Sequence, residues 1–493
     1  MRYMTVELLE NLRKHTKTPA SCGMSNEDVG HFLEIDPLLT EALEEAIVNI
    51  QSLKKRFPKL TELDEVELLS KLPNGFLNFY PATTTSPYVP IAARGPWIIT
   101  FGGGVIYDTG GYGMLGLGHN NDSIHDAMCK PQVMANIMTP SFAQYDFIQK
   151  IRKKIGMYHS SKQCPYQKFI CMNSGSEGMG VALRISDTHA KNVTDPDGSQ
   201  AGKKIKIMSF KRSFHGRTYR AARISGSTRK KYDANLASFR DHSDHIEVNV
   251  NDIDHLTKLY EQCDNDNIYI EALALEPVMG EGNPGNPLCP KFYKAARELT
   301  KKHQTILIID SIQAGLRTQG VLSIVDYPEF EGCEAPDVEI FSKALNGGLY
   351  PLSVVSLQQW VADEYAPGTY GNTMTTNPRA LDVACAVLDA ATPELTKNVR
   401  ERGEEFVSKL KELQSEIPEK IIKVQGTGLL VSAQLKDEIP VVADDGVEQE
   451  LRRFGINVIH GGTNALRFTP WLKMTSEEVD LVVNGVREIL RRF

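Results

Sequence analysis

Short unbroken apolar runs alternate with amphipathic stretches through the middle of the chain. Runs this short and this apolar are typical of strands that are covered on both faces. The predicted strands are residues 168–172, 206–210, 272–278 and 306–309. The predicted helices between them are residues 145–154, 176–190 and 290–303. Strands that alternate with helices predict a doubly wound α/β fold with a mostly parallel sheet.

The two ends of the chain have a different pattern. In residues 1–75, apolar side chains recur at helical spacing, so we expect a helical extension on the outside of the main body. The side chains that carry this pattern are Val6, Leu8, Leu9, Leu12, Leu39, Leu43, Ala46 and Ile47. After Pro378, a predicted helix at 380–391, long charged helices and a strand at 428–435 indicate a smaller α+β domain.

These changes of pattern divide the chain into four parts. They are a helical extension at 1–75, the first part of a small domain at 76–135, a large domain at 136–376 and the rest of the small domain at 377–493. Short strands are expected at 97–101 and 105–108, with eight glycines between residues 102 and 118. Such a run is either a turn-rich connector or a place where the backbone comes close to another group.

Composition narrows the class of protein. A chain of 493 residues is too long for one core, so two or more domains are expected. Its 41% hydrophobic and 24% charged residues are typical of a soluble globular protein. A net charge of −7 gives no indication that the protein binds nucleic acid or an anionic membrane. The clusters at 203–204 and 229–231 are interpreted as solvated turns.

The cysteines and the N-terminus predict a cytoplasmic protein without a metal site. The eight cysteines show no Cys-x-x-Cys spacing, which argues against a zinc site or a redox pair and fits reduced thiols in the cytosol. Residues 1–17 lack the apolar core of a signal peptide, and no apolar run is long enough to cross a bilayer.

The chemistry is expected where the run 306–309 ends in Asp310. Open α/β sheets bind ligands beyond the carboxyl ends of their strands. A buried carboxylate there needs a partner, and a protonated pyridine nitrogen is one that would keep a cofactor ring cationic and able to accept electrons. Gln313 could bind the ring hydroxyl, and Ile312 could pack on a ring face. The alternatives are a turn aspartate and a polar loop residue beside a core residue.

Lys343 is the candidate for a covalent tether. It lies in residues 342–348, where paired glycines follow it, and apolar residues at 340–341 and 344–345 flank it. A lysine nucleophile needs a neutral amine, which desolvation favours. We predict that Lys343 and Asp310 hold opposite ends of pyridoxal 5'-phosphate (PLP), with Lys343 forming the Schiff base and moving the proton once substrate releases it. The alternative is a solvated surface lysine.

Two further segments could complete the site. In residues 173–177, Gly175 and Ser176 lie between a strand and a helix, and a helix N-terminus attracts phosphate. An ordinary N-cap explains the same residue types. In residues 214–218, Phe214 could stack on a planar cofactor, although a core phenylalanine is the simpler reading.

These segments resemble the class III (ω-amino acid) aminotransferases of fold type I, in the family's order and from about residue 90 to the C-terminus. The matching segments are residues 173–177, 214–218, 276–282, 310–315, 342–348 and 373–378. The resemblance implies an α/β fold with a large domain, whose mostly parallel sheet is flanked by helices, and a smaller α+β domain.

The resemblance also implies roles for individual residues. Lys343 is similar to the imine lysine and Asp310 to the pyridinium partner. The other implied cofactor-binding residues are Gly175 and Ser176 (phosphate), Phe214 (stacking), His215, Glu276 (an acid near the site), Ile312 and Gln313 (ring hydroxyl). Thr373 matches a threonine that reaches the cofactor of the neighbouring subunit, which implies a homodimer with shared active sites. Arg467 resembles an arginine that grips a substrate carboxylate, although a surface ion pair explains it equally well.

The chain departs from the family pattern at several positions. Ser311 stands where an acid is usual, Met279 where a glutamine is usual, and residues 375–376 where a glycine pair is usual. The long N-terminal segment is also atypical. These departures put the substrate in doubt.

The predicted function is a PLP-dependent aminotransferase with a ping-pong mechanism. It would move an amino group from an amino acid or ω-amine to a 2-oxo acid. Racemisation, an aminomutase step or decarboxylation on the same scaffold are alternatives, as is a protein that binds the cofactor without turnover. The presence of both Lys343 and Asp310 argues against the last, because a non-catalytic protein does not need the electron sink.

Overall fold

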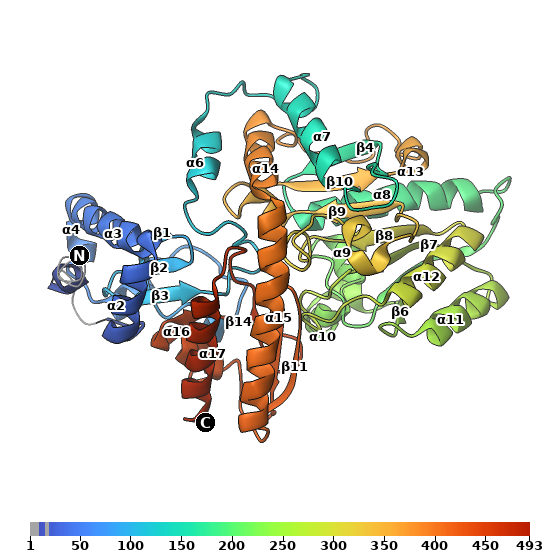
Figure 1. Cartoon of the computed structure of the whole chain (residues 1–493). Helices are drawn as coiled ribbons and strands as arrows, with labels where there is room; N and C mark the ends of the chain where they lie inside the picture. Colours follow the sequence, from blue (N-terminus) through green and yellow to red (C-terminus); the bar gives the residue numbers. More distant parts are fainter. Residues whose placement is uncertain (1–8, 15–18) are drawn as a thin grey trace. The chain divides into compact units, whose positions relative to one another are not determined.

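The computed structural model describes residues 9–14 and 19–493, and the chain forms two compact units (Figure 1). The large unit comprises residues 126–400 and 426–430. The terminal unit comprises the residues up to 125, together with 401–425 and 431–493. No helix in the described part of the chain combines the length and apolar character needed to cross a membrane.

A seven-stranded sheet forms the centre of the large unit. Its order is β4 (Lys168–Met172), β10 (Ser353–Leu357), β9 (Val338–Phe341), β8 (Ile306–Asp310), β7 (Ile268–Leu275), β5 (Lys204–Phe210) and β6 (His245–Val248). Strand β10 is antiparallel to both of its neighbours, and the other pairs are parallel. The predicted mostly parallel sheet is therefore confirmed.

Helices cover both faces of this sheet, and this explains the unbroken apolar runs. On β8, Ile306 and Ile308 pack into a cluster with side chains of α8 (Gly175–Thr194). Leu307 and Ile309 point to the other face and pack with side chains of α11 (Ile253–Asn265) and α12 (Pro290–Lys302). Since successive side chains of a strand alternate between faces, every position of β8 must be apolar.

The remaining helices of the large unit are α7 (Phe142–Lys154), α9 (Tyr219–Arg223), α10 (Arg229–Asn235), α13 (Gln359–Asp363) and α14 (Pro378–Ala390). Helix α15 (Pro393–Glu416) runs from the large unit into the terminal unit, and α6 (Asp122–Cys129) also spans their boundary. The predicted strand 272–278 ends at Leu275, because Glu276 turns into the site described below. The predicted strand 428–435 begins at Leu430, after Gly428 adopts a φ of +51°.

The terminal unit contains two small sheets. One has the order β1 (Pro90–Arg94), β2 (Trp97–Thr100), β3 (Val105–Asp108) and β13 (Ile456–Asn457), and the expected short strands form an antiparallel meander in it. The other has the order β11 (Ile421–Thr427), β12 (Leu430–Leu435), β15 (Ala465–Phe468) and β14 (Ile459–Gly461). Helices α16 (Val447–Phe454) and α17 (Ser476–Leu490) complete the expected α+β arrangement.

The N-terminal extension forms α2 (Asn26–Ile35), α3 (Pro37–Arg56), α4 (Pro58–Thr61) and α5 (Glu65–Lys71). Most of the predicted apolar face is buried, at Leu9, Leu12, Leu39, Leu43 and Ala46, whereas Val6 and Leu8 lie outside the described residues. Helix α3 packs on β1 and β2 (Figure 1). The buried Glu65 carboxylate accepts hydrogen bonds from the Ala20 and Val89 N–H groups, at 2.9 and 2.8 Å.

The glycine run approaches this extension. A Cβ on Gly102 would lie 2.5 Å from the Pro19 Cβ, and one on Gly103 would lie 2.7 Å from the Arg13 Cγ. Neither distance leaves room for a side chain. The predicted close approach is therefore explained at these two positions by residues of the extension.

Candidate active site

Asp310 ends the central strand β8 and is 4% exposed. One carboxylate oxygen accepts a hydrogen bond from the Ile312 N–H at 3.1 Å. The other lies 2.8 Å from the Nδ1 atom of His215, which is also buried. The structure thus holds this carboxylate in a fixed orientation at the carboxyl edge of the sheet, where a ligand of an α/β protein is expected.

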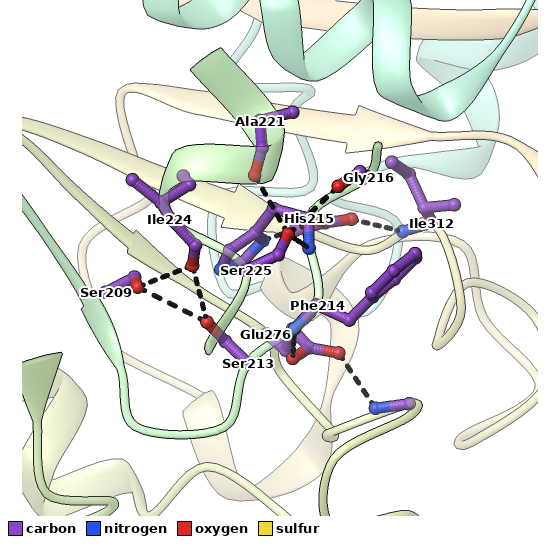
Figure 2. Close-up of polar contacts among 12 residues, drawn as sticks. Ser209, Ser213, Phe214, His215, Gly216, Ala221, Ile224, Ser225, Glu276 and Ile312 are labelled. Carbon is purple, nitrogen blue, oxygen red and sulfur yellow. Dashed lines mark hydrogen bonds and ion pairs between the residues drawn. The ribbon is translucent and has the colours of Figure 1, made fainter. Parts of the chain in front are cut away.

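Glu276 fixes the loops beside this pair (Figure 2). Its carboxylate accepts hydrogen bonds from the N–H groups of Phe214, at 3.0 Å, and Gly280, at 2.8 Å. The pKa of Glu276 is raised to about 7, and burial is the main cause; the charge of Asp310 also acts to raise this pKa, whereas His215 and the two N–H donors act to lower it. Glu276 therefore connects the segment 213–216 with the loop after β7.

Lys343 follows β9, the strand next to β8. The two strands are parallel, with Asp310 opposite Ile340, so both strands end at the same edge of the sheet. Lys343 begins the short helical turn η6 (Lys343–Asn346) with a φ of +48°. Residues other than glycine rarely adopt this left-handed backbone conformation, and those that do are found disproportionately at active sites. Its half-buried amine donates a hydrogen bond to the Oε1 atom of Gln313.

The N-terminus of α8 meets the segment after Asp310. A Cβ on Gly175 would lie 2.7 Å from the Cδ1 atom of Ile312, so a larger residue at 175 would require the Ile312 side chain to move. The Oγ atom of Ser176 accepts a hydrogen bond from the Arg217 N–H at 3.1 Å. Ser174 caps the helix in a capping box with Glu177, so the N-cap and the expected phosphate turn occupy the same helix end.

Contacts connect nine of the predicted site residues in the large unit: Gly175, Ser176, Phe214, His215, Glu276, Asp310, Ile312, Gln313 and Lys343. The two remaining predicted site residues are Thr373 and Arg467. Thr373 is exposed in a turn before α14, in the same unit. Arg467 is buried on β15 of the terminal unit, opposite Ser432 and Ile459.

Comparison with known proteins identifies the family. The sequence model of class-III aminotransferases matches residues 80–490. This chain belongs to the class III aminotransferases. It is accordingly a PLP-dependent enzyme that transfers amino groups, as the sequence predicted. The match begins after helix α5, so the helical extension lies outside it.

Ornithine aminotransferases are among the relatives of this class III aminotransferase. It is 28% identical over 383 residues to ornithine aminotransferase 1 of Staphylococcus saprophyticus, covering 78% of this chain and 89% of the relative. It is 29% identical over 410 residues to an ornithine aminotransferase of Staphylococcus epidermidis, covering 82% and 94%.

Solved structures confirm fold type I. Ornithine aminotransferase from Toxoplasma gondii, described with partial occupancy of PLP at its active site, aligns with a TM-score of 0.73 at 24% identity, covering 90% of this chain and 97% of that one. Acetylornithine aminotransferase from Elizabethkingia anophelis aligns with a TM-score of 0.69 at 24% identity, covering 87% and 100%.

The site residues of this aminotransferase fit PLP. Among the described residues, the buried Nε2 atom of Gln313 has no hydrogen-bond partner and could donate to a ring hydroxyl. The Asp310 carboxylate suits a pyridinium nitrogen, and the first N–H groups of α8 suit a phosphate. These three sets of polar groups match the hydroxyl, the ring nitrogen and the phosphate of the cofactor.

Sequence reasoning missed Glu339, a fully buried carboxylate on β9. One oxygen accepts hydrogen bonds from the Ser311 hydroxyl at 2.6 Å and the Ile324 N–H at 2.9 Å. The other accepts from the hydroxyls of Tyr166, at 2.8 Å, and Ser323. Ser311, where the family pattern predicts an acid, is thus bound to an acid of the adjacent strand. The available signal was a glutamate inside an apolar run just before Lys343.

Glu339 is expected to make the stability of the cofactor-free aminotransferase depend on pH. Burial raises its pKa from 4.5 to about 7. Between these values the folded protein holds a proton that the unfolded chain releases. The contribution of Glu339 to stability is therefore fully present below pH 4.5 and is lost as the pH rises through 7. The contribution lost is about 3 kcal/mol.

A Glu339→Gln variant should lose this part of the pH dependence, because the amide does not ionise. The measurement is the melting temperature of wild-type and variant between pH 5 and pH 8, with the exposed Glu329→Gln as the matched control. Equal slopes in wild-type and the Glu339→Gln variant would contradict the assignment.

Proposed function

We propose that this enzyme transfers an amino group from an amino acid or ω-amine to a 2-oxo acid in a ping-pong reaction, with Lys343 as the residue that carries the cofactor as a Schiff base. The observation that carries this assignment is the contact of the Lys343 amine with Gln313, at the sheet edge that also holds Asp310. A Schiff-base lysine and a pyridinium partner must both reach one ring.

Each site residue has a separate proposed role in the reaction. When bound, PLP supplies an electron sink that makes a proton next to the substrate nitrogen acidic. The Lys343 amine, once released by substrate, is placed to take and return that proton. Asp310 would pair with the protonated ring nitrogen, and His215 would orient Asp310 through its hydrogen bond to that carboxylate. Gln313 would bind the ring hydroxyl, and the first turn of α8 would bind the phosphate.

The first donor to consider is a diamino acid such as ornithine. The similarity to ornithine aminotransferases supports it, although the departures at Ser311 and Met279 leave room for another donor. Arg467 is proposed to bind the substrate carboxylate, because a guanidinium can bind a carboxylate through two parallel hydrogen bonds.

We also propose a homodimer in which Thr373 reaches the cofactor of the partner subunit. Large apolar side chains are exposed at Val133, Met134, Ile137, Met138, Phe142 and Met374, and each of these except Phe142 lines a cavity together with Thr373. A cavity of about 540 Å³ lies beside them, lined by residues that include Ile137, Met138 and Thr373. Apolar surface of this kind marks protein–protein contacts, and a second copy is the proposed occupant.

A cytoplasmic location is proposed on the basis of the cysteines. All eight are free, which fits a reducing compartment.

The half-reaction without acceptor tests the proposed function. Purified enzyme with bound PLP is mixed with single donors (ornithine, N-acetylornithine, lysine and 4-aminobutyrate), and its absorbance spectrum is followed. A true donor should convert the Schiff-base band to that of the cofactor's amine form, and 2-oxoglutarate should restore it. A band that persists with every donor, while a substrate is racemised or loses carbon dioxide, would contradict transamination.

A further inference from the structure

Glu177 joins the expected phosphate turn to the segment that carries Thr373. One carboxylate oxygen accepts hydrogen bonds from the Asn173 and Ser174 N–H groups, both at 3.0 Å. The other oxygen accepts a hydrogen bond from the Nδ2 atom of Asn372 at 3.0 Å. Residues 195 apart in the sequence are therefore held together at the N-terminus of α8, where the helix dipole favours a negative charge.

Asn372 in turn organises the residues that follow it. Its Oδ1 atom accepts a hydrogen bond from the Met374 N–H at 2.9 Å. Its carbonyl accepts from the N–H and the hydroxyl of Thr375, at 3.3 and 3.1 Å. Thr373 lies between these anchors, and its own carbonyl accepts from Asn136 at 3.0 Å. The backbone of Thr373 is thus fixed on both sides while its side chain is exposed.

The residue type at 372 matters for this arrangement. An asparagine side chain can donate to Glu177 with its nitrogen and accept from Met374 with its oxygen at the same time. Alanine would lose both bonds. Aspartate would keep the bond from Met374 but would place a second negative charge against Glu177.

We infer that Asn372 is a positioning residue that sets the place of Thr373 and thereby acts on the cofactor bound by the partner subunit, not on the cofactor of its own subunit. The inference rests on the proposed homodimer and on the proposed reach of Thr373. Glu177 also binds the N–H groups at the phosphate turn of its own subunit. Its carboxylate would therefore link the phosphate turn of one subunit's site with the Thr373 segment that reaches the partner subunit's site.

The first test is cofactor affinity in homodimers. Asn372→Ala should raise the dissociation constant for PLP, measured by equilibrium dialysis, about tenfold, the size of one lost hydrogen bond to a charged group. Asn372→Asp should weaken binding at least as much. The double variant Glu177→Gln with Asn372→Asp should restore it, because the glutamine nitrogen can donate to the new carboxylate. The exposed Asn235→Ala is the matched control.

Heterodimers with two different tags then separate action within a subunit from action across the interface. In the first, one subunit carries Lys343→Ala and the other carries Asn372→Ala. Its single Lys343 site would receive Thr373 from a subunit with an intact Asn372, so the Schiff-base band should titrate with PLP as in wild-type. In the second, one subunit carries both changes. Its single Lys343 site would face the altered turn, and the titration should be weakened about tenfold.

The outcomes distinguish this inference from the function on which it rests. The reverse order of the two heterodimers, equal titrations, or wild-type affinity of Asn372→Ala would overturn the inference and leave the proposed aminotransferase reaction intact. A monomer in gel filtration would contradict the proposed homodimer, and a Lys343→Ala protein that keeps the band would contradict the proposed function; either result would overturn the inference.

Discussion

Replacement of Lys343 by alanine is expected to abolish the Schiff-base absorbance band and nearly all transamination. The variant would lack both the amine that tethers PLP and the group placed to move the proton. The second role alone is typically worth about 10²–10⁴-fold in rate. The measurements are the absorbance spectrum after addition of PLP and the rate of the half-reaction with the best donor.

The loss should not reflect unfolding. Lys343 is half-buried, and its amine donates a hydrogen bond to Gln313, a residue of the same site. The variant should therefore keep the circular dichroism spectrum of wild-type. Lys291→Ala, an exposed position on α12, is the matched control and should keep the band. A Lys343→Ala protein with the band intact would reject the assignment of the tether.

Replacement of Asp310 by asparagine is expected to lower the rate of the half-reaction by about 10²–10⁴-fold, because removing one partner of a buried charge pair costs about 3–5 kcal/mol. The ring nitrogen would lose the carboxylate that keeps it protonated, and His215 would lose its acceptor for a charged hydrogen bond. The Schiff-base band should remain, because Lys343 is unchanged.

The measurements are single-turnover absorbance with donor and equilibrium dialysis of PLP. Rate should fall far more than affinity, since the phosphate turn and Lys343 still hold the cofactor. Asp363→Asn, an exposed aspartate at the end of α13, is the control. A half-reaction of wild-type rate in Asp310→Asn would show that the carboxylate is not the pyridinium partner.

Four of the seven strands of the central sheet, β4, β5, β7 and β8, were predicted from the sequence, because burial on two faces leaves a strong pattern, whereas β6, β9 and β10 were not predicted. The run 306–309 became β8, and residues 168–172 became β4. The predicted strand at 272–278 began four residues late and ended three residues late, since β7 is Ile268–Leu275. It ends there because Glu276 leaves the sheet to bind the N–H groups of Phe214 and Gly280. The apolar residue Val278 follows Glu276 closely, so the hydrophobic pattern did not show that the strand ends before Glu276.

The glycine run shows where a pattern reaches its limit. Glycines indicate that something comes close, yet the neighbours of Gly102 and Gly103 are Pro19 and Arg13, more than eighty residues earlier in the chain. The sequence around the glycines does not predict which distant residues come close to them. A family resemblance is of no help there either, because the matched region begins only at residue 80.

By itself, the sequence determined the order of the residues that are proposed to carry the chemistry: the glycine-serine turn at 175–176, the acid at 310 and the lysine at 343. Only the tertiary structure decided which groups hold them. Ser311 binds Glu339, His215 binds Asp310 and Asn372 binds Glu177, across 28, 95 and 195 residues of chain. A hydrogen bond requires its two atoms to lie about 3 Å apart. The order of strands in the sheet sets that distance, and the order of residues in the chain does not.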